Sequence, residues 1–189
     1  MLAVPRLAPK LRSGRCLNVL VNHCEGRKLM RKQHGFSLIE LMIVVAIILV
    51  IAAIAIPNLM RSRMAANEAS AVGSLRAINN AEVTYSSTYN TYTCSLTALG
   101  PTSGGSSPSS GAAAIIDATL ASGLKSGYTF TNGTCNVSGT GITTSYQWLG
   151  DPSAPGTSGS RHFCTDDTFN IKVDPNSSSN CLTIGSPVG

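Results

Sequence analysis

The sequence has few of the residues that build a large apolar core, and it lacks the common catalytic motifs. It holds four Phe and one Trp in 189 residues, so we expect a small core that needs stabilisation from another source. The motifs H-E-x-x-H, G-x-S-x-G and C-x-x-C and the P-loop are absent, and His162 is the only histidine after residue 35. These absences argue against an enzyme and favour a structural protein.

Charge is absent from the twenty positions between Leu41 and Met60. About 20 apolar residues are enough for a helix to span a bilayer, so this run predicts a membrane segment. Residues 1–35 hold eight Lys/Arg and one acidic residue, a net charge of +7, whereas residues 36–189 hold six Lys/Arg and eight Asp/Glu, a net charge of −2. Because the positive charge lies beside a membrane segment, we infer no nucleic-acid partner from it.

The residues around this run follow a specific pattern. The stretch Gly35-Phe36-Ser37-Leu38-Ile39-Glu40 ends a basic segment and places one carboxylate directly before the run, and Pro57 lies near its far end. In its glycine, phenylalanine, glutamate and proline, this pattern resembles the class III signal of type IV pilins and type II secretion pseudopilins. The resemblance implies cleavage between Gly35 and Phe36 by the membrane aspartyl prepilin peptidase, followed by N-methylation of Phe36. Residues 1–35 are then a removed leader, with Met30 as the expected true start.

The resemblance also implies a location and a set of partners. We expect a single-pass protein of the bacterial inner membrane, with a cytoplasmic N-terminus and a periplasmic head. Homo-oligomerisation on an inner-membrane assembly platform would then give a periplasmic or extracellular filament. Four basic residues flank the start of the run and three follow it, a difference too small to fix the orientation by the positive-inside rule. The expected orientation therefore rests on the resemblance.

Glu40 and Pro57 are the expected assembly residues. A carboxylate within a bilayer costs about a few kcal/mol, so we expect Glu40 to pair with the amine of Phe36 on a neighbouring subunit, a group that exists only after cleavage. The alternative is a carboxylate at headgroup depth with no role. Pro57 removes the hydrogen bond to the Ala53 carbonyl, which predicts a kink or a locally melted stretch; the alternative is a plain helix end.

The remaining pattern predicts an α+β pilin fold. A helix of about fifty residues continues from the membrane segment (36–60) through an amphipathic half (61–91), in which Val72, Leu75, Ile78 and Ala81 recur at three-residue steps. A small antiparallel head follows at 92–189, with a mobile Ser/Gly-rich loop at 101–111 and a short helix at 115–120. We expect strands at 128–131, 145–149, 161–165 and 170–173, and turns at 132–133, 151–152, 155–156 and 166–167.

Four cysteines follow the membrane segment: Cys94, Cys135, Cys164 and Cys181. In a segment facing away from the cytoplasm they indicate two disulfides, for which three pairings are possible, and the alternative is free buried thiols. Pilins that resemble this chain often cross-link a C-terminal loop. That resemblance favours the pairs Cys94–Cys135 and Cys164–Cys181.

A metal site is a weaker possibility. His162, Cys164, Asp166 and Asp167 cluster in the sequence, and some pseudopilins that resemble this chain hold calcium in a C-terminal loop. Asp166, Asp167 and Asp174 are the candidate ligands. No spaced series of oxygen ligands follows them, so a solvated hairpin turn is favoured and no cofactor is expected.

Three functions remain open. The first is a type IV pilus subunit, and the second is a type II secretion pseudopilin that drives export. The third is a soluble secreted protein with an ordinary signal peptide, in which 41–51 is the hydrophobic region and Ala53-Ile54-Ala55 the cleavage box. Glu40 and the continuing helix argue against the third. The large, Ser/Gly-rich head with four cysteines favours a pilin over a pseudopilin.

Overall fold

A computed structural model describes residues 35–176 and 181–188 of the chain. The predicted leader up to residue 34, including the proposed start at Met30, lies outside the described residues. The structure divides into one unit that ends at Leu41 and a second, compact unit from Met42 onward.

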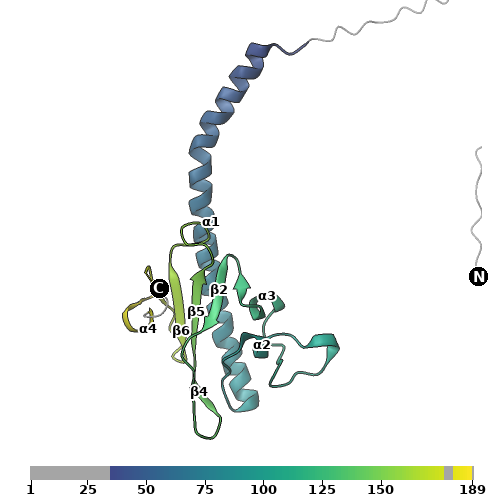
Figure 1. The fold of residues 1–189 in the computed structure, drawn as a ribbon, viewed down its shortest axis with the longest axis vertical. Coiled ribbons are helices and arrows are strands. Elements are labelled where there is room, and N and C mark those ends of the chain that lie inside the picture. Colours follow the sequence, from purple (N-terminus) through teal and green to yellow (C-terminus); the bar gives the residue numbers. More distant parts are fainter. Residues whose placement is uncertain (1–34, 177–180, 189) are drawn as a thin grey trace, which may run out of the picture. The chain divides into compact units, whose positions relative to one another are not determined.

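The main helix, α1, runs from Leu38 to Tyr89. Its 52 residues agree with the predicted length, and it passes through Pro57 without interruption. Figure 1 draws α1 as one continuous helix. The alternative of a plain helix end at Pro57 is therefore wrong, and the helix is not melted there in this structure. Three short helices follow in the head, namely α2 (Leu96–Leu99), α3 (Ala118–Ala121) and α4 (Cys181–Ile184), with a 3₁₀ turn at Ser103–Gly105.

The head is built on a six-stranded antiparallel sheet in the order β1-β2-β5-β6-β7-β8. Its strands are β1 (Leu124–Lys125), β2 (Tyr128–Asn132), β5 (Gln147–Pro152), β6 (His162–Asp166), β7 (Lys172–Asp174) and β8 (Ser186–Pro187). A separate hairpin pairs β3 (Asn136–Val137) with β4 (Thr143–Ser145). The long helix followed by this sheet confirms the expected pilin fold.

The core lies between the sheet and the second half of α1 (Figure 1). Side chains alternate along a strand, so every second residue of β2, β5 and β6 faces the helix. The largest of these are Tyr128, Phe130, Trp148 and Phe163, all at most 3% exposed. They pack with the predicted stripe of α1, in which Leu75, Ile78 and Ala81 are buried and Val72 is half-buried.

Several boundaries differ from the sequence prediction. Residues 151–152, predicted as a turn, end β5, where Pro152 pairs with Tyr128. Proline is tolerated at that point because a missing N–H matters least at a strand end. The strand predicted at 145–149 corresponds to β5 and starts only at Gln147, because Ser145 belongs to β4 and pairs with Asn136 of β3. The short helix begins at Ala118, since Asp117 acts as its N-cap and accepts a hydrogen bond from Leu120 N.

Candidate assembly helix and its attachment to the head

The first half of α1 exposes an apolar surface. All large apolar side chains from Phe36 to Met60 are exposed, from 44% for Val44 to 74% for Phe36. By length and composition, α1 contains the one candidate membrane span among the described residues, with a mean hydropathy of 3.2 over its most apolar window. Each buried Leu, Ile or Met side chain contributes roughly 1.5–3 kcal/mol, so this surface requires lipid or a protein partner to cover it.

The predicted processing site lies just before α1. Residues 35–37 are not helical, and Leu41 N donates the first hydrogen bond of the helix to Ser37 O. Gly35 and Phe36 therefore precede the helix. Ser37 and Glu40 have the S-x-x-E spacing of a capping box, a pattern that favours a helix start here and that the sequence analysis did not use.

The second half of α1 is attached to the head by buried polar side chains as well as by apolar packing. Glu68, Asn79 and Glu82 are 6%, 3% and 0% exposed. Asn79 and Glu82 directly follow the apolar positions Ile78 and Ala81, and the three-residue period of the apolar stripe does not predict that they are buried. No local signal separates them from Asn80, which is exposed, because the partners Tyr146 and Trp148 lie 67 and 66 residues further along the chain.

Glu68 fixes the start of β6. Its Oε1 accepts hydrogen bonds from the backbone N and the Oγ of Ser160, and its Oε2 forms an ion pair with Arg161 at 2.6 Å. Burial alone would raise the pKa of Glu68, but the hydrogen bonds from Ser160 and the charge of Arg161 outweigh it and hold that pKa below its ordinary value. Arg161 also lies over the Phe163 ring at 5.7 Å.

Asn79 joins α1 to β6 and to Tyr146, the residue between β4 and β5. Its Nδ2 donates to Thr165 Oγ1 of β6 at 2.8 Å, and its Oδ1 accepts from the hydroxyl of Tyr146 at 3.2 Å. Both ends of the amide are therefore satisfied. Burial, and secondly the negative charge of Glu82, raise the pKa of Tyr146, which keeps this hydroxyl protonated and able to donate.

Glu82 connects α1 to the segment that follows it and to β5. Its Oε2 accepts from Thr93 N at 2.9 Å, and its Oε1 accepts from Trp148 Nε1 at 3.0 Å. Both donors are neutral, and the described residues supply no cation. Burial raises the pKa of Glu82 to about 7, and the two hydrogen bonds offset only part of that effect.

Disulfides are present in the head, as expected. The structure joins Cys94 to Cys135 and Cys164 to Cys181, which are the pairings that the sequence analysis favours. The first bond connects the segment after α1 to the start of β3. The second fixes α4 to the outer face of β6.

The three candidate calcium ligands are not brought together. Asp166 ends β6 and accepts hydrogen bonds from the backbone N and the hydroxyl of Thr168. Asp174 lies in β7 opposite His162, so four residues of β6, about 13 Å, separate it from Asp166. His162 instead contacts Asp151, with 2.6 Å between Nδ1 and Oδ1. Among the described residues, no group of three His, Cys, Asp or Glu side chains is arranged to hold a metal ion.

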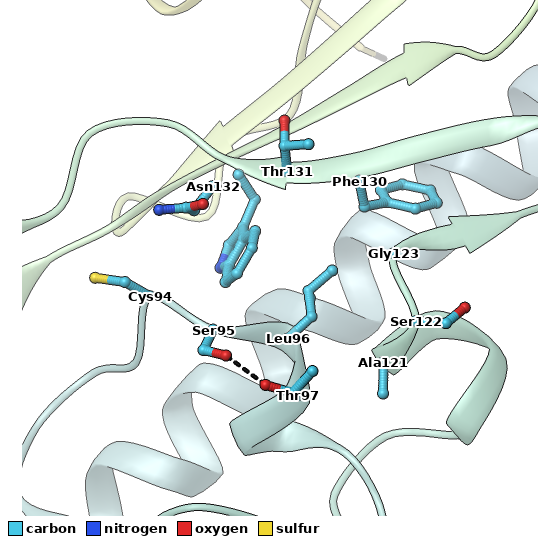
Figure 2. A pocket seen from close by; sticks show the side chains of 11 residues that line it. Cys94, Ser95, Leu96, Thr97, Ala121, Ser122, Gly123, Phe130, Thr131 and Asn132 are labelled. Carbon is cyan, nitrogen blue, oxygen red and sulfur yellow. Dashed lines mark hydrogen bonds between the residues drawn. The ribbon is translucent and has the colours of Figure 1, made fainter.

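A shallow pocket of about 250 Å³ opens beside β2 (Figure 2). Its lining comes from β2, from Trp148 and from the segments 94–97 and 121–123. None of these side chains is ionisable, since Cys94 is in a disulfide. Ser95 and Thr97 share a hydrogen bond at its rim. The pocket therefore holds no nucleophile with a neighbouring base, and it offers no acid–base chemistry.

The N-terminal part of the chain is similar to that of known filament proteins. The family "Prokaryotic N-terminal methylation motif" matches residues 30–56, which include the predicted cleavage site and Glu40. The type IV wide pilus major component PilA4 of Thermus thermophilus is 41% identical over 70 residues, or 37% of this chain and 53% of that protein. The type II secretion system core protein G of Vibrio cholerae is 43% identical over 54 residues, or 29% of this chain and 37% of that protein.

A third relative is the type IV major pilin protein PilA of Myxococcus xanthus, 43% identical over 61 residues, or 32% of this chain and 28% of that protein. The chain thus spans about half or less of the length of each relative. The methylation motif, these relatives and the fold confirm the resemblance to type IV pilins and type II secretion pseudopilins.

Proposed function

We propose that this chain is a structural subunit of a type IV pilus-like filament. In this proposal it enters the inner membrane, loses its leader to a prepilin peptidase and polymerises through the first half of α1. The observation that supports the proposal best is the unbroken apolar surface from Phe36 to Met60, directly after a prepilin motif. Lipid covers such a surface before assembly, and parallel copies of the same helix cover it in a filament.

The head suits this role because it leaves that surface free. Its core and its buried polar contacts use only the second half of α1, from Glu68 to Tyr85. The first half is therefore available for lipid or for other subunits while the head stays folded.

The second candidate is a pseudopilin of a type II secretion system. The sequence identity to core protein G is 43%, which is as high as the identities of 41% and 43% to the two pilins, and this similarity favours the second candidate. The soluble secreted protein is less well supported, because its cleavage box, Ala53-Ile54-Ala55, lies inside α1.

The test is the intact mass of the protein isolated from its own bacterium, followed by deletion of its gene. We expect a mature chain that starts at Phe36 and carries one added methyl group. Deletion should remove surface filaments and leave protein export normal. Loss of export with surface filaments intact would instead support the pseudopilin, and a mature chain that starts at Ile56 would overturn both.

A further inference from the structure

Two sets of charged surface side chains have no ion-pair partner among the described residues. The ion pairs in that part of the chain are Glu68–Arg161, Asp117–Lys125 and Asp151–His162. One unpaired set consists of arginines on α1, and the other lies in the turn between β6 and β7. The members of these two sets are Arg61, Arg63 and Arg76, and Asp166 and Asp167.

The turn after β6 presents an acidic and an apolar side chain together. Phe169 is 46% exposed, and its φ of 63° is a conformation that bulky residues rarely adopt. Phe169 N donates to Asp166 O, and Thr168 donates to the Asp166 carboxylate. Because Asp166 is used to hold the turn, Asp167 and Phe169 are the side chains left for an external contact. We call these two residues the head tip.

A complementary surface lies on α1, just where the apolar run ends. Leu59 and Met60 are 63% and 47% exposed, and Arg63 is also exposed. Arg63 follows them by four and three positions, so the three side chains lie on one face of the helix. We call this face the α1 patch. Like the head tip, it combines apolar area with charge, but the charge has the opposite sign.

The two surfaces cannot meet within one chain. The strand β6 runs in the same direction as α1, since Glu68 contacts Ser160 at its start and Asn79 contacts Thr165 near its end. Arg63 lies 16 positions before Asn79, or about 24 Å along the helix axis at 1.5 Å per residue. The head tip follows Thr165, so it lies at least that far from the α1 patch of its own chain.

We propose that the head tip of one subunit docks on the α1 patch of a second copy of this chain. The inference rests on the proposed filament, in which the copies are parallel because all are inserted by the same N-terminal segment. Two parallel copies shifted by about 25 Å along the helix axis bring the surfaces together. Phe169 then covers Leu59 and Met60, and Asp167 pairs with Arg63. Such a contact has an apolar centre and a charged rim, which is the usual composition of a protein interface.

A charge exchange in the full-length protein, expressed in its own bacterium, tests the pairing. Because like charges oppose docking, Arg63→Asp and Asp167→Arg should each lower filament yield by about tenfold or more, and the double variant should recover most of it. The matched control combines Asp167→Arg with Arg76→Asp and should show no recovery. Failure of the first double variant to recover would overturn the inference. A normal yield from Asp167→Arg alone would also overturn it.

Cross-linking in isolated filaments gives an independent measurement. We expect the pair Met60→Cys and Phe169→Cys to form disulfide-linked oligomers on oxidation, and the control pair Ala77→Cys and Phe169→Cys to stay monomeric. Equal cross-linking of the two pairs would contradict the docking. Absence of filaments from the unaltered protein would refute the proposed function itself, whereas filaments without charge recovery or selective cross-linking would refute this inference alone.

Discussion

Glu82 illustrates how a single buried carboxylate can make the attachment of the head to α1 depend on pH. Its pKa is about 7 in the folded chain, compared with an ordinary value of 4.5. The folded chain therefore keeps a proton that the unfolded chain releases between about pH 4.5 and 7. Because the native state binds more protons in this window, the free energy of unfolding falls as the pH rises through it.

We predict that Glu82→Gln removes most of this dependence. At 1.36 kcal/mol per pKa unit, the unaltered head should lose on the order of 3 kcal/mol of stability between pH 4.5 and 7. Glutamine is uncharged and keeps an oxygen acceptor for one of the two donors, Thr93 N or Trp148 Nε1. Urea unfolding of a soluble fragment that starts after Pro57, measured at several pH values, gives the comparison. The control Asp167→Asn, at an exposed carboxylate, should keep the slope, and an unchanged slope in Glu82→Gln would contradict the assignment.

At the scale of the elements, α1 has two halves with different environments. The first half is apolar on all sides and exposed, whereas the second half has one face buried under the sheet. Pro57 lies within the first half, where the Ala53 carbonyl loses its helical partner. The helix is nevertheless continuous there, since neighbouring turns on both sides keep their hydrogen bonds.

The first turn of α1 carries the element-scale prediction, because Glu40 is the one charged side chain of the apolar half. We predict that Glu40→Ala is cleaved and stays in the membrane but yields few filaments, since it inserts more easily yet loses its attraction to the neighbouring Phe36 amine. Filament yield and mature mass should be measured together. Glu40→Asp keeps the charge and should retain part of the yield. Normal assembly of Glu40→Ala would refute the role given to this carboxylate.

At the scale of the whole molecule, the head combines a small core with two disulfides. The bond between Cys164 and Cys181 closes a separation of 17 residues, and the bond between Cys94 and Cys135 closes one of 41. In the chain-entropy model such loops contribute about 3 and 4 kcal/mol. The net stability of a small domain is only about 5–15 kcal/mol, so either contribution is a large share of it.

We predict that Cys181→Ser lowers the melting temperature of the soluble fragment by roughly 10 °C. Cys181 is fully buried against β7, so Cys181→Ala, which avoids burying a hydroxyl, is the matched comparison. Peptide mapping without reductant should recover the Cys164–Cys181 cross-link. Alkylation of all four cysteines in the native protein would refute the cross-linked head, and a Cys135–Cys164 peptide would refute only the connectivity.

Local patterns in the sequence are enough to predict several features of the chain. Twenty positions without charge specify a membrane-length helix, and Gly35, Phe36 and Glu40 at fixed offsets specify the prepilin motif. Alternation and turn residues located four of the strands to within a few residues. These signals are readable because helix and strand periods and turn propensities act over a few neighbouring residues.

Which polar residues of α1 are buried depends on contacts between segments far apart in the sequence. Asn79 and Asn80 are adjacent asparagines, yet the first is bonded to Thr165 and Tyr146 and the second is exposed. Glu82 is buried because Trp148 of β5 and Thr93 of the segment after α1 donate hydrogen bonds to it. In the same way, the register of β6 and β7 separates Asp174 from Asp166. Partners far apart in the sequence meet only once the sheet has formed on the helix, so the free energy of burying these groups has no local signature.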